Sequence, residues 1–302
     1  AAGKPCPSFG PEDDAWEDDT DQDCGSTAVT LCLHEVVSHV QGSIEARASL
    51  FSKRIDAVHS HSTVNGLLVT LDNGLQGAGT AGSHTPGSMA KILATITLIL
   101  EAMGVDWQQH AVFGDIGSGV GLALLGALGV GFPIALGIEM GVGADEQLNL
   151  ALAHLRAASL IRQTAICDVM WGTMMGRPNG ATVVDMGRTR RSSRPRAVRD
   201  YAMESRGVFG NCFNVVLGCD TVKAVFAFDA VFVADAKATL REFVCGDAAI
   251  RVFVTGVHKG KPSALEDACA GLRGSFQLIT KLDGSMKGSS SEGFDMLVFA
   301  RL

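Results

Sequence analysis

Several patterns that mark common protein classes are missing from this sequence. The eight cysteines include no Cys-x-x-Cys pair, and no signal-peptide pattern is found before them. A disulfide framework or a zinc ribbon is therefore disfavoured, and we expect free thiols in a reducing compartment. Cys24, Cys32, His34 and His39 lie close in the sequence, but their spacing fits no zinc finger or knuckle, so no metal site is predicted.

Charged residues are also scarce, at 19% of the chain, and the formal net charge of −7 argues against a general nucleic-acid binder. The charge is unevenly distributed, with eight acidic residues between Glu12 and Asp23. We expect residues 1–25 to be a solvated, disordered tail; the alternative is an acidic segment that attracts basic partners such as histones. The remaining composition, 47% apolar with 36 glycines, is typical of a packed α/β protein.

One stretch without charge, Gly119 to Ile138, is long enough to span a bilayer. Three glycines and a proline interrupt its second half, and Asp115 and Glu139 bracket it. A buried helix followed by a buried parallel strand gives the same hydropathy, and we favour that interpretation and expect no membrane partner.

The pattern after residue 105 alternates strand and helix, as a parallel sheet with crossover connections does. We expect an α/β fold: a doubly wound, seven-strand Rossmann-like sheet in residues 106–302, with a helical N-terminal extension in residues 26–105. Strands are predicted over 111–116, 133–139, 164–168, 228–234 and 250–255, followed by an antiparallel pair over 276–281 and 296–301. Helices are predicted over 26–54, 88–103, 121–128, 145–159 and 236–244.

The crossover between the third and fourth predicted strands, residues 171–227, is longer than a compact domain needs. It carries a cluster of arginines: Arg188, Arg190, Arg191, Arg194, Arg196 and Arg199. Such a basic insertion is either a plain solvated loop or a patch for nucleic acid, nucleosomes or nuclear import.

A glycine-rich turn follows the first strand of the sheet. Its sequence, from Asp115 to Gly121, has the form Asp-x-Gly-x-Gly-x-Gly, with Gly117, Ser118 and Gly119 at its centre and Leu122 where a dinucleotide fingerprint has its third glycine. This form suits S-adenosylmethionine, which has no phosphate and carries a cationic amino-acid end that a carboxylate helps to place. A nicotinamide dinucleotide enzyme is the main alternative.

Two more carboxylates follow, each at the predicted end of the next strand. Glu139 ends the second strand, where an acid accepts hydrogen bonds from both ribose hydroxyls, and Asp168 ends the third, where it can accept from the adenine amino group. The predicted cofactor site thus consists of Asp115, Gly117, Ser118, Gly119, Gly121, Glu139 and Asp168.

On these residues the chain resembles the Dot1-type (disruptor of telomeric silencing, non-SET) histone lysine methyltransferases. Asp115 to Gly121 is similar to that family's Asp-Leu-Gly-Ser-Gly-Val-Gly, Leu136 to Glu139 to its Gly-Val-Glu strand end, and Ala230 to Val233 to its strand four. Gly284 to Ser289 resembles its closing Leu-Lys-Gly-Ser segment. The resemblance implies a nuclear S-adenosylmethionine-dependent enzyme acting on histones or nucleosomes; a cytoplasmic location is the alternative.

Two family motifs are altered. The family's Asn-Asn-Phe after strand four, which lines the methyl-transfer channel, is matched to Ala234-Asp235-Ala236, and its Tyr-Gly-Glu loop to the segment Ser83 to Gly87. Asp235 is the candidate catalytic residue, as an orienting acid for the amine, unless it only caps a helix. Phe228 and Phe232 are assigned to the core in preference to the channel. The alternatives are a methyltransferase for RNA or a small molecule, and an inactive chromatin-interaction module.

Overall fold

A computed structural model describes residues 33–65, 83–119, 121–139, 145–171, 222–232, 234–284, 286–287 and 293–301, all of them within one unit of the chain, residues 31–302. The predicted acidic tail, Cys24, Cys32 and the arginine cluster at 188–199 lie outside these ranges. The predictions made for them stay predictions.

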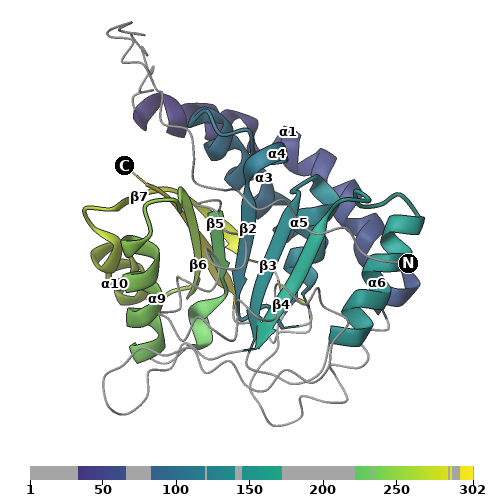
Figure 1. The fold of residues 1–302 in the computed structure, drawn as a ribbon. Helices are drawn as coiled ribbons and strands as arrows, with labels where there is room; N and C mark the ends of the chain where they lie inside the picture. The colour runs from purple at the N-terminus through teal and green to yellow at the C-terminus, as the bar shows by residue number, and fades with distance from the viewer. Residues whose placement is uncertain are drawn as a thin grey trace, which may run out of the picture. The chain divides into compact units, whose positions relative to one another are not determined.

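The described part of the chain is organised around a seven-stranded sheet of order β4-β3-β2-β5-β6-β9-β7 (Figure 1). The first five of these strands are parallel, and β9 runs antiparallel to both β6 and β7. The strands are β2 (Val112–Ile116), β3 (Ile134–Glu139), β4 (Ile166–Trp171), β5 (Val222–Ala227), β6 (Val252–His258), β7 (Phe276–Gly284) and β9 (Phe294–Arg301). This is the doubly wound Rossmann-like sheet that the alternating pattern predicted, including its antiparallel closing pair.

Helices cover both faces of this sheet (Figure 1). One face packs against α1 (Leu33–His59), α3 (Pro86–Ala102), α5 (Leu122–Val130) and α6 (Asp145–Ala157). The other face packs against α9 (Ala234–Gly246) and α10 (Pro262–Leu272), of which α10 was not predicted. The predicted helices at 88–103, 121–128, 145–159 and 236–244 are confirmed, and α1 confirms a helix in the N-terminal region.

The fourth strand lies elsewhere than predicted. β5, residues 222–227, is the true neighbour of β2, and it occupies the end of the segment that the sequence suggested was an insertion. Residues 229–231 form a 3-10 turn, and α9 begins at Ala234, so the predicted strand over 228–234 is wrong. The cause is the buried Asp229, whose Oδ1 accepts hydrogen bonds from Thr255 Oγ1 and from Gly256 N (3.0 Å) and so bends the chain inside a long apolar run.

The charge-free stretch at 119–138 forms α5 and then β3, as favoured. Gly129 lets α1 approach α5 closely, because a Cβ at this position would lie 2.9 Å from Val58 Cγ2. His59 Nε2 is also 3.0 Å from Leu122 O, at the start of α5. Among the described helices, none is both long and apolar enough to cross a membrane.

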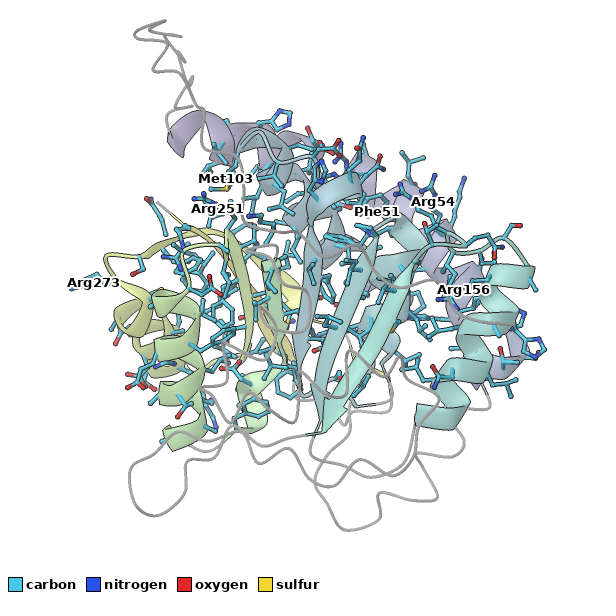
Figure 2. All side chains as sticks on the ribbon, in the orientation of Figure 1. Phe51, Arg54, Met103, Arg156, Arg251 and Arg273 are labelled. Carbon is cyan, nitrogen blue, oxygen red and sulfur yellow. The ribbon has the colours of Figure 1, made fainter. Side chains whose placement is uncertain are left out.

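The N-terminal helices are joined to the sheet at its amino edge, where α4 (Trp107–His110) precedes β2. Phe51 packs edge-on against Trp107, with ring centroids 6.3 Å apart, and the Arg54 guanidinium donates to Val130 O at 3.3 Å; Figure 2 labels both α1 side chains. Arg47 of α1 pairs with Glu101 of α3 at 2.5 Å. These contacts fix α1 and α3 against the sheet.

A second, two-stranded sheet lies at the other edge. It pairs β1 (Ser83–His84) antiparallel with β8 (Met286–Lys287). β1 leads directly into α3, whose N-cap Thr85 accepts a hydrogen bond from Ser88 N at 3.3 Å and whose first residue is Pro86. Neither short strand was predicted, because a two-residue strand leaves no periodic signal.

Candidate functional site

The glycine turn predicted from the sequence joins β2 to α5 at the carboxyl edge of the parallel strands. All five residues of β2 are buried, and Gly117, Gly119 and Gly121 have φ values of +80°, +53° and +83°. Only glycine adopts this left-handed region without strain, which explains the three glycines at alternate positions. A Cβ at Gly119 would meet nothing within 4 Å, so there is space beside the chain at this residue.

The side chain of Ser118, in the middle of this turn, packs over a glycine of the neighbouring strand. Ser118 is buried, and its Oγ makes no hydrogen bond within the described residues. A Cβ at Gly137 would lie 2.7 Å from Ser118 Cβ, so Gly137 leaves the space that Ser118 occupies. Gly137 pairs with Asp115 in the register of β2 and β3, and Asp115 is itself buried.

Of the two acids predicted at strand ends, Glu139 does lie at the end of its strand and Asp168 does not. Glu139 is the last residue of β3, one strand away from Asp115, as expected. Asp168 does not end its strand, because β4 continues through the apolar residues 169–171 and pairs with β3 as far as Trp171. Their side chains lie outside the described set, so the ribose and adenine roles stay predictions.

Asp235, the predicted catalytic residue, is the second residue of α9 and does not follow strand four directly. Asp235 was chosen because it follows the strand predicted over 228–234, and the structure has no strand there. Its catalytic role therefore stays a prediction that has lost this support. The residues that do follow strand four are Phe228, Asp229 and Ala230. Asp229 was missed because it lies inside an apolar run; burial raises the pKa of its carboxyl, while the hydrogen bond from Thr255 acts in the opposite direction.

Two phenylalanines assigned to the core, Phe228 and Phe232, also flank the site. Phe232 approaches the glycine turn, where a Cβ at Gly117 would lie 3.1 Å from Phe232 Cζ. Phe228 is half-buried, and its ring lies 4.9 Å from that of Phe294 in a T-shaped arrangement. Both rings do pack against the core, but they also form apolar walls beside the turn and beyond the end of β5.

His84, in β1, packs against the same group of aromatic side chains. Its ring centroid lies 5.6 Å from that of Phe226 and 5.4 Å from that of Phe228, both edge-on. The residue is only 6% exposed, and burial lowers the pKa of its imidazole to about 4. No sequence pattern points to His84, because the rings that it packs against, Phe226 and Phe228, lie more than 140 positions away.

The residues present fit S-adenosylmethionine. The turn offers space beside Gly119 and a Ser118 hydroxyl that has no hydrogen-bond partner within the described residues, and an acidic residue ends the adjacent strand. Leu122, in the place of the third glycine of a dinucleotide fingerprint, is buried as the first residue of α5. No group of three or more metal-ligating side chains occurs within the described ranges.

Comparison with known proteins finds no matching family model and no matching curated protein. Solved structures with this type of fold include the protein PH1948 from Pyrococcus horikoshii, provisionally described as an RNA methyltransferase. It is 13% identical, with a TM-score of 0.41, and the match covers 79% of this chain and 98% of that one. A ribosomal protein L11 methylase from Lactobacillus delbrueckii subsp. bulgaricus is 14% identical, with a TM-score of 0.35 and coverage of 73% and 81%.

TrmK of M. capricolum, solved with S-adenosyl-homocysteine, is 8% identical, with a TM-score of 0.35 and coverage of 68% and 67%. Identities and scores this low leave the substrate open. The fold itself follows from the strand order, with its antiparallel last pair, and from the glycine turn after the central strand. The chain has a class I methyltransferase fold.

Proposed function

We propose that this protein is an S-adenosylmethionine-dependent methyltransferase. The observation that carries the proposal is the Asp115–Gly121 turn, whose three glycines all have positive φ at the carboxyl end of the central strand. Bound there, S-adenosylmethionine would supply an electrophilic methyl group. The competing nicotinamide assignment is disfavoured by Leu122, whose buried side chain replaces the third glycine of the dinucleotide pattern.

The chain's own residues would bind and orient the cofactor. Gly117 and Gly119 allow close approach of the backbone, and the buried carboxyl of Asp115 would lie near the cationic amino-acid end. Glu139 would accept hydrogen bonds from the ribose and Asp168 from the adenine. Phe232 would exclude water from the turn, which strengthens the electrostatic interactions within the site.

The acceptor that we propose is a lysine side chain of a histone, most simply within a nucleosome. The support is the resemblance to Dot1-type enzymes in the Asp115–Gly121 turn and the Leu136–Glu139 strand end. Phe228, Asp229 and Ala230 follow the observed strand four, β5, and they do not repeat that family's Asn-Asn-Phe. Because Asp229 accepts hydrogen bonds from Thr255 and Gly256, it would stabilise the ends of β5 and β6. The aromatic side chains beside it would then face the acceptor.

The proposed partners follow from the same resemblance. Arg188, Arg190, Arg191, Arg194, Arg196 and Arg199 would contact nucleosomal DNA, and the enzyme would work in the nucleus. The altered motifs favour one further candidate, an inactive chromatin-interaction module that retains cofactor binding.

The test offers the purified protein labelled S-adenosylmethionine together with nucleosomes, free histones or RNA. We expect label on a histone lysine, identified by mass spectrometry, and stronger labelling of nucleosomes than of free histones. Label only on RNA would support an RNA methyltransferase, and cofactor binding without transfer to any acceptor would support the inactive module. The Asp115→Ala, Glu139→Ala double variant is the negative control for every acceptor.

A further inference from the structure

One buried polar atom beside the site has no role in the function proposed above. His84 Nε2 makes no hydrogen bond within the described residues, although the residue is only 6% exposed. Leaving a buried nitrogen without a partner costs on the order of 1–3 kcal/mol, so such atoms often mark functional positions. Its ring packs against Phe226 at the end of β5 and Phe228 just beyond it, beside the residues expected to face the methyl acceptor.

The hydrogen bonds on the other side of the ring favour one of its two neutral tautomers. Ser88 Oγ lies 3.4 Å from Asp283 O and 3.3 Å from His84 Nδ1. A carbonyl oxygen can only accept, whereas an imidazole nitrogen can donate or accept, so the arrangement that makes both contacts hydrogen bonds has the Ser88 hydroxyl donating to Asp283 O. His84 Nδ1 must then donate to Ser88 Oγ, which leaves Nε2 with a bare lone pair.

Burial keeps this lone pair available. Because desolvation lowers the pKa of His84 to about 4, the imidazole is neutral at physiological pH and is too weak a base to hold a proton from an amine or an alcohol. Nε2 is therefore a hydrogen-bond acceptor that takes no proton.

We propose that His84 Nε2 accepts a hydrogen bond from the N–H of an uncharged nitrogen nucleophile, and so orients the methyl acceptor between the aromatic walls. This assignment rests on the proposed methyltransferase function and narrows its substrate class to amines and related N–H acceptors. His84 is a positioning and specificity residue here, since the proton that the methylated nitrogen finally loses goes to water.

The surroundings of the ring favour this occupant over two others. A charged ammonium would need a counter-charge to offset its loss of water, and the neighbours that the ring packs against or hydrogen-bonds, Phe226, Phe228 and Ser88, carry no charge. A hydroxyl nucleophile would need a base strong enough to remove its proton, which His84 is not. A neutral amine needs only orientation, and it is also the form that has a free lone pair for attack.

The test compares His84→Phe, which keeps an aromatic ring without an acceptor, with His84→Gln, whose carbonyl oxygen can reach the place of Nε2. His110→Phe, at an exposed position of α4, is the matched control. For each variant the readouts are the kcat and KM for nucleosomes, the Kd for S-adenosylmethionine and the thermal midpoint. Nitrogen-15 NMR of the histidine rings in the wild type reports the tautomer independently of turnover.

We expect His84→Phe to bind the cofactor within twofold of wild type and to lose about tenfold in kcat, the size of one oriented hydrogen bond. His84→Gln should recover part of this loss, and NMR should place the proton of His84 on Nδ1. Equal kcat values for His84→Phe and wild type, or a proton on Nε2, would overturn the assignment while leaving the methyltransferase proposal intact. A wild-type protein that binds cofactor but methylates no amine would instead overturn the proposed acceptor, and the role of His84 with it.

Discussion

At the scale of single residues, His84 couples the stability of the fold to pH. Its pKa is about 4 in the folded chain and near 6.5 when exposed, so between these values the unfolded chain binds a proton that the folded chain does not. The free energy of unfolding should therefore fall as the pH drops from 6.5 towards 4, by up to about 3 kcal/mol. Urea unfolding of the wild type at pH 7.5, 6.0 and 4.5 measures this change.

His84→Gln removes the titrating group and should flatten that part of the profile. Asp229 contributes with the opposite sign, because its raised carboxyl pKa favours the folded state at low pH, but this contribution is common to both proteins and cancels in their difference. Identical slopes for wild type and His84→Gln between pH 4.5 and 6.5 would contradict the burial-driven shift at His84.

Gly137 is the residue on which the shape of the glycine turn depends. In Gly137→Ala the new Cβ must displace Ser118, and we expect a loss of about 1–3 kcal/mol in stability together with at least tenfold weaker S-adenosylmethionine binding. Calorimetric titration and urea unfolding measure the two effects. Gly87→Ala, where a Cβ would meet nothing within 4 Å, is the control, and equal cofactor affinity in the two variants would show that Ser118 does not shape the site.

Residues differ in how much the sequence reveals about them. The turn from Asp115 to Gly121 was predictable because its requirement for positive φ is local and glycine is the residue that meets it. His84 and Asp229 were not, because each gains its character from distant residues: Phe226 and Phe228 in one case, Thr255 and Gly256 in the other. Burial of a polar side chain among apolar neighbours leaves no periodic trace.

At the scale of elements, the contact between α1 and α5 depends on Gly129. Gly129→Ala places a Cβ 2.9 Å from Val58 Cγ2, and overpacking should cost about 1–3 kcal/mol of stability despite alanine's better helix propensity. Val58→Ala should lose stability alone but relieve the clash in the double variant. Urea unfolding measures the loss of unfolding free energy in each variant. The losses of the two single variants should add up to at least about 0.5 kcal/mol more than the loss of the double variant.

Gly42→Ala in α1 is the control for this cycle, because open space surrounds Gly42 and the change should be neutral or stabilising. If the losses of the two single variants simply add, the two helices do not meet at this pair.

Elements with a clear period were predictable, and the one misplaced strand shows the limit of that signal. The charge-free stretch at 119–138 resolved into α5 and β3 because flanking glycines and a proline divide it. Between 222 and 234 the sequence is apolar on both sides of Asp229 except at Lys223, so hydropathy alone cannot decide which half forms the strand. Pairing decides it, since β5 lies between β2 and β6 and residues 229–231 lie beyond the sheet edge.

At the scale of the whole molecule, the strand order brings the functional residues to one edge. The glycine turn follows the central strand β2, Glu139 ends its neighbour β3, and Phe228 follows β5 on the other side, so the predicted cofactor residues and the aromatic walls meet where the parallel strands end. Sequence could place the acids near strand ends, but it could not show that β1 folds over this edge, because that contact joins residues 83–84 to residues 286–287.

The central claim is that this edge binds S-adenosylmethionine through the glycine turn. Calorimetric titration of the purified protein with S-adenosylmethionine tests it most directly, alongside the Asp115→Ala, Glu139→Ala double variant and NADH as a competing ligand. We predict that the wild type binds S-adenosylmethionine, does not bind NADH, and loses at least tenfold in affinity in the double variant while unfolding with the same cooperativity. A wild type that prefers NADH, or a double variant that binds S-adenosylmethionine as tightly as the wild type, would contradict it.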